Sequence, residues 1–280
     1  MVHSEGIFVT PDGLTIYHQA WLPDSDRKAV IVLLHGLAEH SARYAHVARR
    51  LTDAGYAVHA LDHRGHGRSD GKRTFVKTYA QYQSDILQFR QLVEQQHAGL
   101  PLFVLGHSMG GNLALGHVLD HQAGVRGLAL SAPALAPGSS LSASKIKLAK
   151  LIGKIAPGLR PEALSSDAIS RDPAVVAAYV ADPLVFNGKI TAGAAAALLE
   201  SMESFPSRFG ELRLPILLQH GTADALVDIA GTRALEAGAV NAAVTSHYYD
   251  GLYHEIFNEP ERAAVLSDTV GWLDSVTASG

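Results

Sequence analysis

The sequence lacks cysteine and long apolar runs. With no cysteine among its 280 residues, disulfide bonds, thiolate metal sites and a cysteine nucleophile are all excluded. No segment approaches the roughly 20 consecutive apolar residues of a membrane-spanning helix. The first residues also lack the basic head and the apolar stretch of a secretory signal. From these absences we expect a soluble, cytoplasmic protein.

The sequence also lacks an excess of basic charge. Its 23 basic and 27 acidic side chains give a formal net charge of −4. No overall field therefore attracts the protein to phosphate backbones, and we expect no nucleic-acid partner. Neither of the glycine-rich nucleotide-binding patterns, G-x-x-x-x-G-K-[ST] and G-x-G-x-x-G, occurs, and we expect no cofactor.

Histidine is abundant, with 15 residues, which raises the question of a metal site. Two pairs, His63 with His66 and His117 with His121, have spacings that could bring two imidazoles together. Neither pair has the HExxH arrangement or an adjacent carboxylate cluster. We therefore interpret these four histidines as structural or surface residues and expect no bound metal.

Short apolar segments rich in β-branched residues alternate with segments of helical periodicity. The predicted strands are 14–21, 29–34, 56–61, 102–105, 125–130, 216–219 and 244–249. The predicted helices are 44–54, 79–96, 109–119 and 261–276. This alternation predicts an α/β protein whose mostly parallel sheet is covered by helices on both faces. The length fits one domain that spans residues 1–280.

The alternation stops between about residues 133 and 213, where Pro, Ser and Ala accumulate and no strand is predicted. We interpret this segment as a helical insertion over the sheet and call it the cap. Within it, residues 145–155 form a basic amphipathic helix whose apolar face includes Leu148, Leu151 and Ile155. We expect this face to cover a pocket; contact with an anionic membrane or a lipid aggregate is a second possibility.

The pattern G-x-S-x-G occurs twice, around Ser69 and around Ser108. Structural context distinguishes them, because a nucleophilic serine in this pattern needs a strand, a sharp turn and a helix. Ser108 follows the predicted strand 102–105 and precedes the predicted helix 109–119, whereas Ser69 has neither neighbour. The glycines around Ser108 permit a strained turn. We predict that Ser108 is the nucleophile and that Ser69 belongs to a loop.

Two carboxylates compete for the role of catalytic acid. Where this serine motif occurs, the acid and then the base follow the nucleophile, each on a loop after a later strand. Asp224 lies close to the end of strand 216–219, whereas Asp228 lies where a helix that begins at Ile229 needs an N-cap. We predict that Asp224 is the acid and that Asp228 is the cap residue.

The predicted base is His254, which lies in the loop after the last strand and can reach both the serine and the acid. His247 lies within that strand, where a histidine more often has a structural role. His220 precedes the acid and is excluded by order.

A tetrahedral intermediate needs two backbone N–H donors for its oxyanion. One normally comes from the residue after the nucleophile, here Met109, and the other from a loop after an earlier strand. The segment His35-Gly36-Leu37 directly follows strand 29–34. We therefore predict the amides of Leu37 and Met109 as the oxyanion donors.

Four motifs together resemble the monoacylglycerol lipase family, particularly its actinobacterial members: HGLAEHSARY, LDHRGHGRS, GHSMG and GLYHE. The resemblance extends into the cap through ISRDP and YVADPL. It implies an α/β-hydrolase fold with a helical cap after the sixth strand, and the same triad and oxyanion donors. It also implies substrate contacts by Glu39, Arg43 and Tyr179. The structural alternatives are a Glu39–Arg43 ion pair that pins the loop and a core role for Tyr179.

The resemblance implies hydrolysis of monoacylglycerol to glycerol and a fatty acid through an acyl-enzyme on Ser108, with the acyl chain in an apolar tunnel under the cap. A lysophospholipase or short-chain carboxylesterase with the same triad is the alternative, because fold and triad do not specify the leaving group. A non-catalytic ligand-binding protein of this fold is a third interpretation, and the complete triad argues against it.

Overall fold

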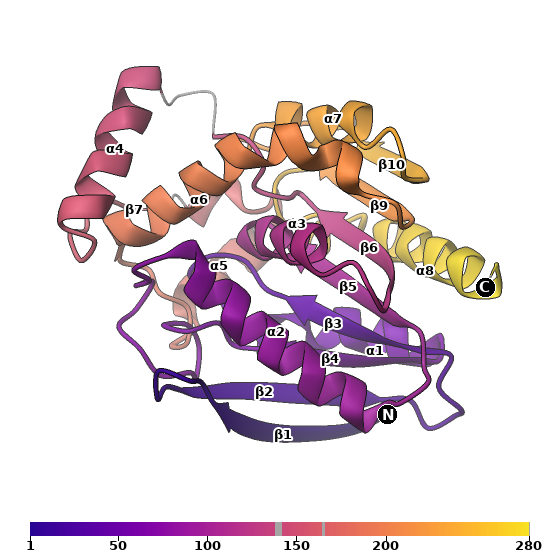
Figure 1. Cartoon of the computed structure of the whole chain (residues 1–280). Coiled ribbons are helices and arrows are strands. Elements are labelled where there is room, and N and C mark those ends of the chain that lie inside the picture. Colours follow the sequence, from indigo (N-terminus) through magenta and orange to yellow (C-terminus); the bar gives the residue numbers. More distant parts are fainter. Residues whose placement is uncertain (138–141, 164–165, 280) are drawn as a thin grey trace.

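The computed structural model describes residues 1–137, 142–163 and 166–279 (Figure 1). Its centre is an eight-stranded sheet with the order β1-β2-β4-β3-β5-β6-β9-β10. The strands of this sheet are β1 (Val2–Val9), β2 (Thr15–Leu22), β3 (Ala29–Leu34), β4 (Tyr56–Leu61), β5 (Leu102–His107), β6 (Val125–Ser131), β9 (Ile216–Gly221) and β10 (Val244–Tyr249). The helices outside the cap are η1 (Ser41–Tyr44), α1 (Ala45–Asp53), α2 (Tyr79–Gln96), α3 (Met109–Asp120), α7 (Ile229–Gly238) and α8 (Arg262–Ala278).

The predicted α/β class with a mostly parallel sheet is confirmed. Neighbouring strands run parallel from β4 through β3, β5, β6 and β9 to β10, whereas β1 and β2 pair antiparallel at one edge. Every residue of β3, β4, β5 and β9 is buried. Strands covered on both faces need mostly apolar side chains at consecutive positions, which explains the apolar runs in these strands; His59 in β4 and Gln219 and His220 in β9 are buried polar exceptions.

The two faces of the sheet pack against different helices. In β3, Val30, Val32 and Leu34 point into one hydrophobic cluster, whereas Ile31 and Leu33 point into the other. The first cluster includes residues of α2 and α3, and the second includes residues of α1 and α8. Figure 1 shows α2 and α3 in front of the sheet and α1 and α8 behind it. The alternation of side chains along one strand thus builds two cores at once.

Strand β1 was not predicted from the sequence. It pairs with β2 over eight residues, from Val2 opposite Leu22 to Val9 opposite Thr15. Most of its residues are exposed at the sheet edge, so it has no apolar pattern that would identify it. The turn after Thr10 brings β1 alongside β2. In this turn Gly13 adopts a φ of 85°, which favours glycine.

The cap segment lies between β6 and β9. Its elements are α4 (Ala143–Ile155), β7 (Glu162–Ala163), η2 (Ser166–Ala168), α5 (Pro173–Ala181), β8 (Lys189–Ile190), α6 (Ala192–Ser204) and η3 (Phe205–Glu211). The prediction of no strand here was wrong, because β7 and β8 pair antiparallel in a small sheet of their own. Two residues per strand are too few to give an alternating pattern.

The amphipathic helix predicted at residues 145–155 is present as α4, but its apolar face is not covered. Leu148, Leu151 and Ile155 are 56%, 54% and 75% exposed. The expectation that these side chains pack over a pocket was therefore wrong. The cause is Gly153, which is buried against α6 so closely that an added Cβ would lie 2.3 Å from the Cβ of Ala196. In Figure 1, α4 projects away from the sheet.

Candidate active site

Four loops meet at the carboxyl edge of the parallel strands, as is usual for functional sites in such sheets. They are the oxyanion loop (residues 35–40) after β3, the turn at Ser108 after β5, the acid loop (residues 222–228) after β9 and the base loop (residues 250–256) after β10. Residues that are distant in the sequence thereby become neighbours.

The strand, turn and helix predicted around Ser108 are confirmed. Ser108 separates β5 from α3 and has a φ of 54°, a left-handed conformation that is strained for a residue with a side chain. Two glycines make this turn possible. A Cβ at Gly106 would lie 2.3 Å from the carbonyl oxygen of Gly110, and a Cβ at Gly110 would lie 2.1 Å from that of Leu34.

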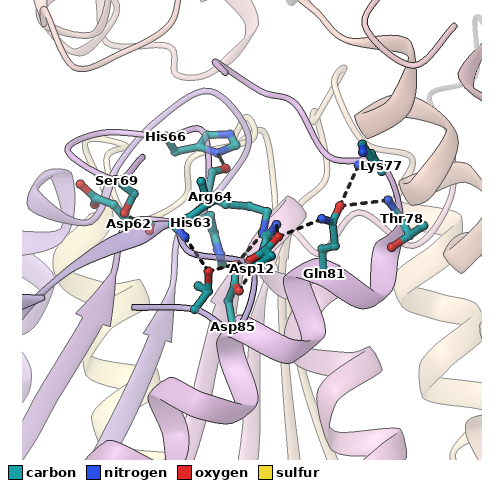
Figure 2. A network of polar contacts seen from close by, with 12 residues as sticks. Asp12, Asp62, His63, Arg64, His66, Ser69, Lys77, Thr78, Gln81 and Asp85 are labelled. Carbon is teal, nitrogen blue, oxygen red and sulfur yellow. Dashed lines mark hydrogen bonds and ion pairs between the residues drawn. The ribbon is translucent and has the colours of Figure 1, made fainter. Parts of the chain in front are cut away.

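Ser69 lies in a loop, as predicted, and its hydroxyl has structural partners. Its Oγ donates to the carbonyl oxygen of Asp62 at 2.6 Å and accepts from the backbone N–H of Tyr17 at 2.9 Å. Figure 2 shows Ser69 beside Asp62, and Arg64 of the same loop paired with Asp85. The side chain of Ser69 therefore ties its loop to the sheet.

The predicted acid and base are hydrogen-bonded to each other. Nδ1 of His254 donates to Oδ2 of Asp224 at 2.7 Å, and both side chains are buried. The other oxygen of Asp224 accepts from the backbone N–H groups of Leu226 at 2.8 Å and Val227 at 3.0 Å. The carboxylate of Asp224 is thus held by its own loop and orients the imidazole of His254.

The pair stabilises opposite charges on its two members. Burial alone would raise the pKa of Asp224, but the charge of His254 and the hydrogen bonds from His220 and His254 hold this pKa well below its usual range. Burial alone would lower the pKa of His254, yet the Asp224 carboxylate outweighs it and raises the pKa. A buried ion pair of this kind favours an imidazole that can take up a proton during a reaction.

The competing residues have other partners. Asp228 is the N-cap of α7, as predicted, and its carboxylate accepts from the backbone N–H of Ala230 at 2.9 Å. His247 lies in β10 with Nδ1 3.7 Å from Oδ2 of Asp268. His220 contacts Asp224, with 3.1 Å between Nε2 of His220 and Oδ2 of Asp224.

The oxyanion loop lies against Ser108. A Cβ at Gly36 would be 3.3 Å from the Cβ of Ser108. The backbone N–H of Gly36 donates to Oε1 of Glu39 at 2.6 Å, so it is already engaged. Within the described part of the chain, the amides of Leu37 and Met109 have no hydrogen-bond acceptor. These two N–H groups therefore remain the candidate oxyanion donors.

Glu39 and Arg43 form the ion pair that the structural alternative describes. Nη1 of Arg43 lies 2.6 Å from Oε2 of Glu39. Burial would raise the pKa of Glu39, but the charge of Arg43 outweighs it and lowers the pKa. The guanidinium also binds both carboxylate oxygens of Glu255 at 2.7 Å and lies 4.6 Å from the ring centroid of Tyr179. Arg43 thus connects the oxyanion loop, the base loop and the cap.

Glu255 and His107 were missed by the sequence analysis. Glu255 follows His254 directly, but no feature of the sequence connects it to Arg43, which lies 212 positions away. The ring of His107 lies 4.8 Å from that of His254, and its Nδ1 is 3.1 Å from Oγ of Ser131. Burial lowers the pKa of His107 to about 3, so this ring stays neutral beside the base.

The cap segment is bonded directly to two of these loops. The backbone N–H of Phe186 donates to the carbonyl oxygen of Ala38 in the oxyanion loop at 2.8 Å. The backbone N–H of Glu255 in the base loop donates to the carbonyl oxygen of Ile169 at 2.7 Å. Part of the cap therefore forms a wall of the site.

Three of the four histidines in the two pairs with possible metal-ligand spacing are buried: His63, His66 and His117. His63 and His66 pack beside His35, and burial lowers the pKa of His66 to about 4. His117 packs beside His121, and burial lowers the pKa of His117 to about 3. Among the residues that the structure describes, no group of three or more His, Cys, Asp or Glu is arranged to hold a metal ion.

Two surface cavities lie near the site without including Ser108. One, of about 730 Å³, is lined by α5 and by Tyr253 of the base loop. The other, of about 340 Å³, lies between the β1–β2 edge and His40. The predicted acyl tunnel stays a prediction.

None of the helices in the described ranges is long and apolar enough to span a membrane.

The fold and this site define a serine hydrolase of the α/β-hydrolase class. The family model described as "Serine aminopeptidase, S33" matches residues 25–261. The chain is 43% identical to the monoacylglycerol lipase of Mycolicibacterium smegmatis over 97% of both chains. It is 32% identical to human monoglyceride lipase, over 97% of this chain and 90% of the human one. The chain therefore belongs to the family that this model describes and, within it, to the monoacylglycerol lipases.

A solved structure supports the same relationship. The monoacylglycerol lipase of Paleococcus ferrophilus superimposes with a TM-score of 0.84 at 30% identity, covering 99% of this chain and 100% of that one. Both the eight-stranded sheet and the cap segment fall within this match. The chain is thus a serine carboxylester hydrolase by family.

Proposed function

We propose that this protein hydrolyses monoacylglycerol to glycerol and a free fatty acid, with Ser108 as nucleophile, Asp224 as acid and His254 as base. The observation that carries the proposal is the buried Asp224–His254 hydrogen bond, with the His254 ring 4.8 Å from that of His107, which directly precedes the strained turn of Ser108. The 43% identity to a relative named monoacylglycerol lipase supports the substrate class.

The reaction begins when Nε2 of His254 takes the proton of Ser108 and Oγ attacks the ester carbonyl. The amides of Leu37 and Met109 donate to the oxyanion, in a buried site where such bonds are strongest. Collapse of the intermediate breaks the ester C–O bond, and the proton on His254 passes to glycerol as it leaves. Water, deprotonated by the same histidine, then releases the fatty acid and regenerates Ser108.

We further propose that Glu39 and Arg43 act by fixing the loops rather than by binding glycerol. Glu39 engages the Gly36 amide and Arg43 chelates Glu255, so their polar atoms are occupied. Tyr179 packs on Arg43 from the cap, and we assign it to the wall of the alcohol site. Residues 1–280 would then act as one domain in which the cap, residues 133–213, completes the pocket.

The exposed face of α4 supports a second role for the cap, which is contact with lipid aggregates. Three large apolar side chains, Leu148, Leu151 and Ile155, lie on the surface next to the exposed Lys145 and Lys147. An apolar stripe with adjacent lysines is typical of helices that lie on anionic membrane surfaces. We propose that α4 holds the protein transiently at such a surface.

A substrate panel tests the choice of leaving group. We expect the highest kcat/KM on monooleoylglycerol, with lower values on lysophosphatidylcholine, on an acetate ester and on an aminoacyl naphthylamide. Each buried methylene of the acyl chain contributes about 0.8 kcal/mol, so a long-chain ester should exceed an acetate ester by several orders of magnitude. A preference for lysophosphatidylcholine would favour a lysophospholipase, a preference for acetate would favour a short-chain esterase, and amide cleavage would favour a peptidase.

A further inference from the structure

Asp224 accepts hydrogen bonds from two histidines, and only one of them is the proposed base. Its Oδ2 lies 2.7 Å from Nδ1 of His254 and 3.1 Å from Nε2 of His220. Its Oδ1 accepts from the backbone N–H groups of Leu226 and Val227. Because the side chain of Asp224 is completely buried, these four contacts take the place of its hydration shell.

Both ring nitrogens of His220 have hydrogen-bond partners. An ionised carboxylate only accepts hydrogen bonds, so Nε2 of His220 must carry the proton that it donates to Asp224. The other ring nitrogen, Nδ1, lies 2.7 Å from Oγ1 of Thr232. Nδ1 and the Thr232 hydroxyl are therefore hydrogen-bonded to each other. His220 and Thr232 are both fully buried, so water does not compete for either bond.

These bonds connect two rigid elements to the acid. His220 is in β9 and Thr232 is in α7, the helix that begins after the N-cap Asp228. The orientation of the imidazole is therefore set from the helix side, and the imidazole in turn sets the position of Oδ2. A hydrogen bond to a buried charged group is among the stronger ones in proteins, so its loss should be measurable.

We propose that His220 is a positioning residue of the triad: its Nε2–H holds Oδ2 of Asp224 in the direction of Nδ1 of His254. This inference rests on the proposed roles of Asp224 and His254. His220 touches no reacting atom and acts through Asp224. Because Oδ2 divides its charge between two donors, His220 also limits how strongly Asp224 stabilises the protonated form of His254.

Other titratable side chains also face His254, and the variants compared below leave these side chains unchanged. They are the carboxylates Glu255 and Glu39 and the neutral imidazole of His107. A change in the titration of His254 on removal of the His220 donor would therefore come through Asp224.

The test compares His220→Leu, His220→Gln and Thr232→Val with the unmodified protein in the hydrolysis of p-nitrophenyl butyrate between about pH 5 and 9. His220→Leu should lower kcat by about 10- to 100-fold with little change in KM, and should move the acid limb of kcat/KM to higher pH. Thr232→Val should produce a smaller change in the same direction. His220→Gln, whose side-chain amide can donate from nearly the position of Nε2, should recover most of the activity.

A matched control is His117→Leu, which removes a different buried histidine that packs against His121. It should lower stability without moving the acid limb. If His220→Leu does not fold, Thr232→Val and His220→Gln decide the question. The proposal would be overturned if Thr232→Val left the acid limb of the kcat/KM profile at its original pH. It would also be overturned if His220→Gln lowered kcat as much as His220→Leu does.

The rate of Ser108 labelling by a fluorophosphonate separates this inference from the proposed function, because it needs no particular ester. An unmodified protein that does not label at Ser108 would overturn the proposed function itself. An unmodified protein that labels, with His220→Leu labelling at the same rate and with the same pH dependence, would overturn only the role of His220.

Discussion

At the scale of single residues, Asp224 and Asp228 are four positions apart and have different tasks. The first accepts from His254, and the second caps α7. Asp224→Asn should lower kcat by about 10⁴-fold, because the amide would favour the wrong tautomer of His254. Asp228→Asn should be nearly silent because asparagine caps equally well, and Asp228→Ala should cost about 0.5–2 kcal/mol of unfolding free energy.

Steady-state kinetics and thermal unfolding of the three variants check this assignment together. The unmodified protein gives the reference for both measurements. A folded Asp228→Asn that is inactive, beside an Asp224→Asn that is active, would reverse the two roles.

The pH dependence of the reaction is also set by one residue. His254 must be neutral to take the proton of Ser108, and Asp224 raises its pKa above the ordinary value of 6.5. Below that raised pKa the imidazole is protonated and inactive, so kcat/KM should fall on the acid side with a midpoint above 6.5. A pH profile of kcat/KM on a soluble ester measures the midpoint. A midpoint below 6.5 would contradict the observed pairing.

The positions of the candidate triad residues at strand ends could be predicted from the sequence, because chain order and strand ends restrict the choice. Ser108, Asp224 and His254 each follow an apolar run, and parallel strands bring such loops together. The bridge from Arg43 to Glu255 could not be predicted, because 212 positions separate the two residues. The contact of His220 with Asp224 was hidden for a different reason, since order excluded His220 as a base and left no other role to assign.

At the scale of elements, the buried strands and the edge strand β10 were predicted, whereas the edge strand β1 and the cap strands were not. Consecutive apolar residues identify β3, β4, β5 and β9, because both faces of these strands are covered. β1 forms by pairing with β2, although most of its side chains face solvent. Strand pairing depends on backbone groups, which every residue has, and so leaves little trace in the sequence.

The orientation of α4 was not predictable either. Its periodicity correctly predicted an amphipathic helix, and an apolar face ordinarily packs inward. Here the helix contacts α6 through Gly153, and Lys150 and Lys154 pair with Glu203 and Glu200 on the same side. Close approach through a glycine and ion pairs thus outweighed the burial of leucine side chains.

The exposed lysines of α4 give the prediction at this scale. Lys145→Glu with Lys147→Glu should weaken binding to anionic vesicles by about 2 kcal/mol, because each basic residue near such a surface contributes about 1 kcal/mol. Hydrolysis of monooleoylglycerol in these vesicles should fall, whereas hydrolysis of a soluble short-chain ester should not. Vesicle sedimentation and both assays, at low and high salt, measure the effect.

A control with the same change in charge is Arg49→Glu with Arg50→Glu, on α1 behind the sheet (Figure 1). This variant should bind and hydrolyse as the unmodified protein does. Equal losses in the two double variants, or a loss on the soluble ester, would show that α4 has no specific role at the surface.

At the scale of the whole molecule, the sheet positions the loops of the candidate site and the cap contacts two of these loops. Two hydrophobic cores hold the strands whose carboxyl ends position the catalytic loops. The cap is fastened to the oxyanion loop through Phe186 and to the base loop through Ile169, while α4 extends outward. The candidate site thus lies at the sheet, and the surface proposed for lipid contact lies away from it.

The central claim is that Ser108, and not Ser69, is the nucleophile of an ester hydrolase. The most direct measurement is hydrolysis of monooleoylglycerol by Ser108→Ala and Ser69→Ala, with mass spectrometry of the fluorophosphonate adduct on the unmodified protein. We predict an adduct on Ser108, a loss of several orders of magnitude in kcat for Ser108→Ala, and a much smaller loss for Ser69→Ala. An adduct on Ser69, or comparable losses in the two variants, would contradict the account.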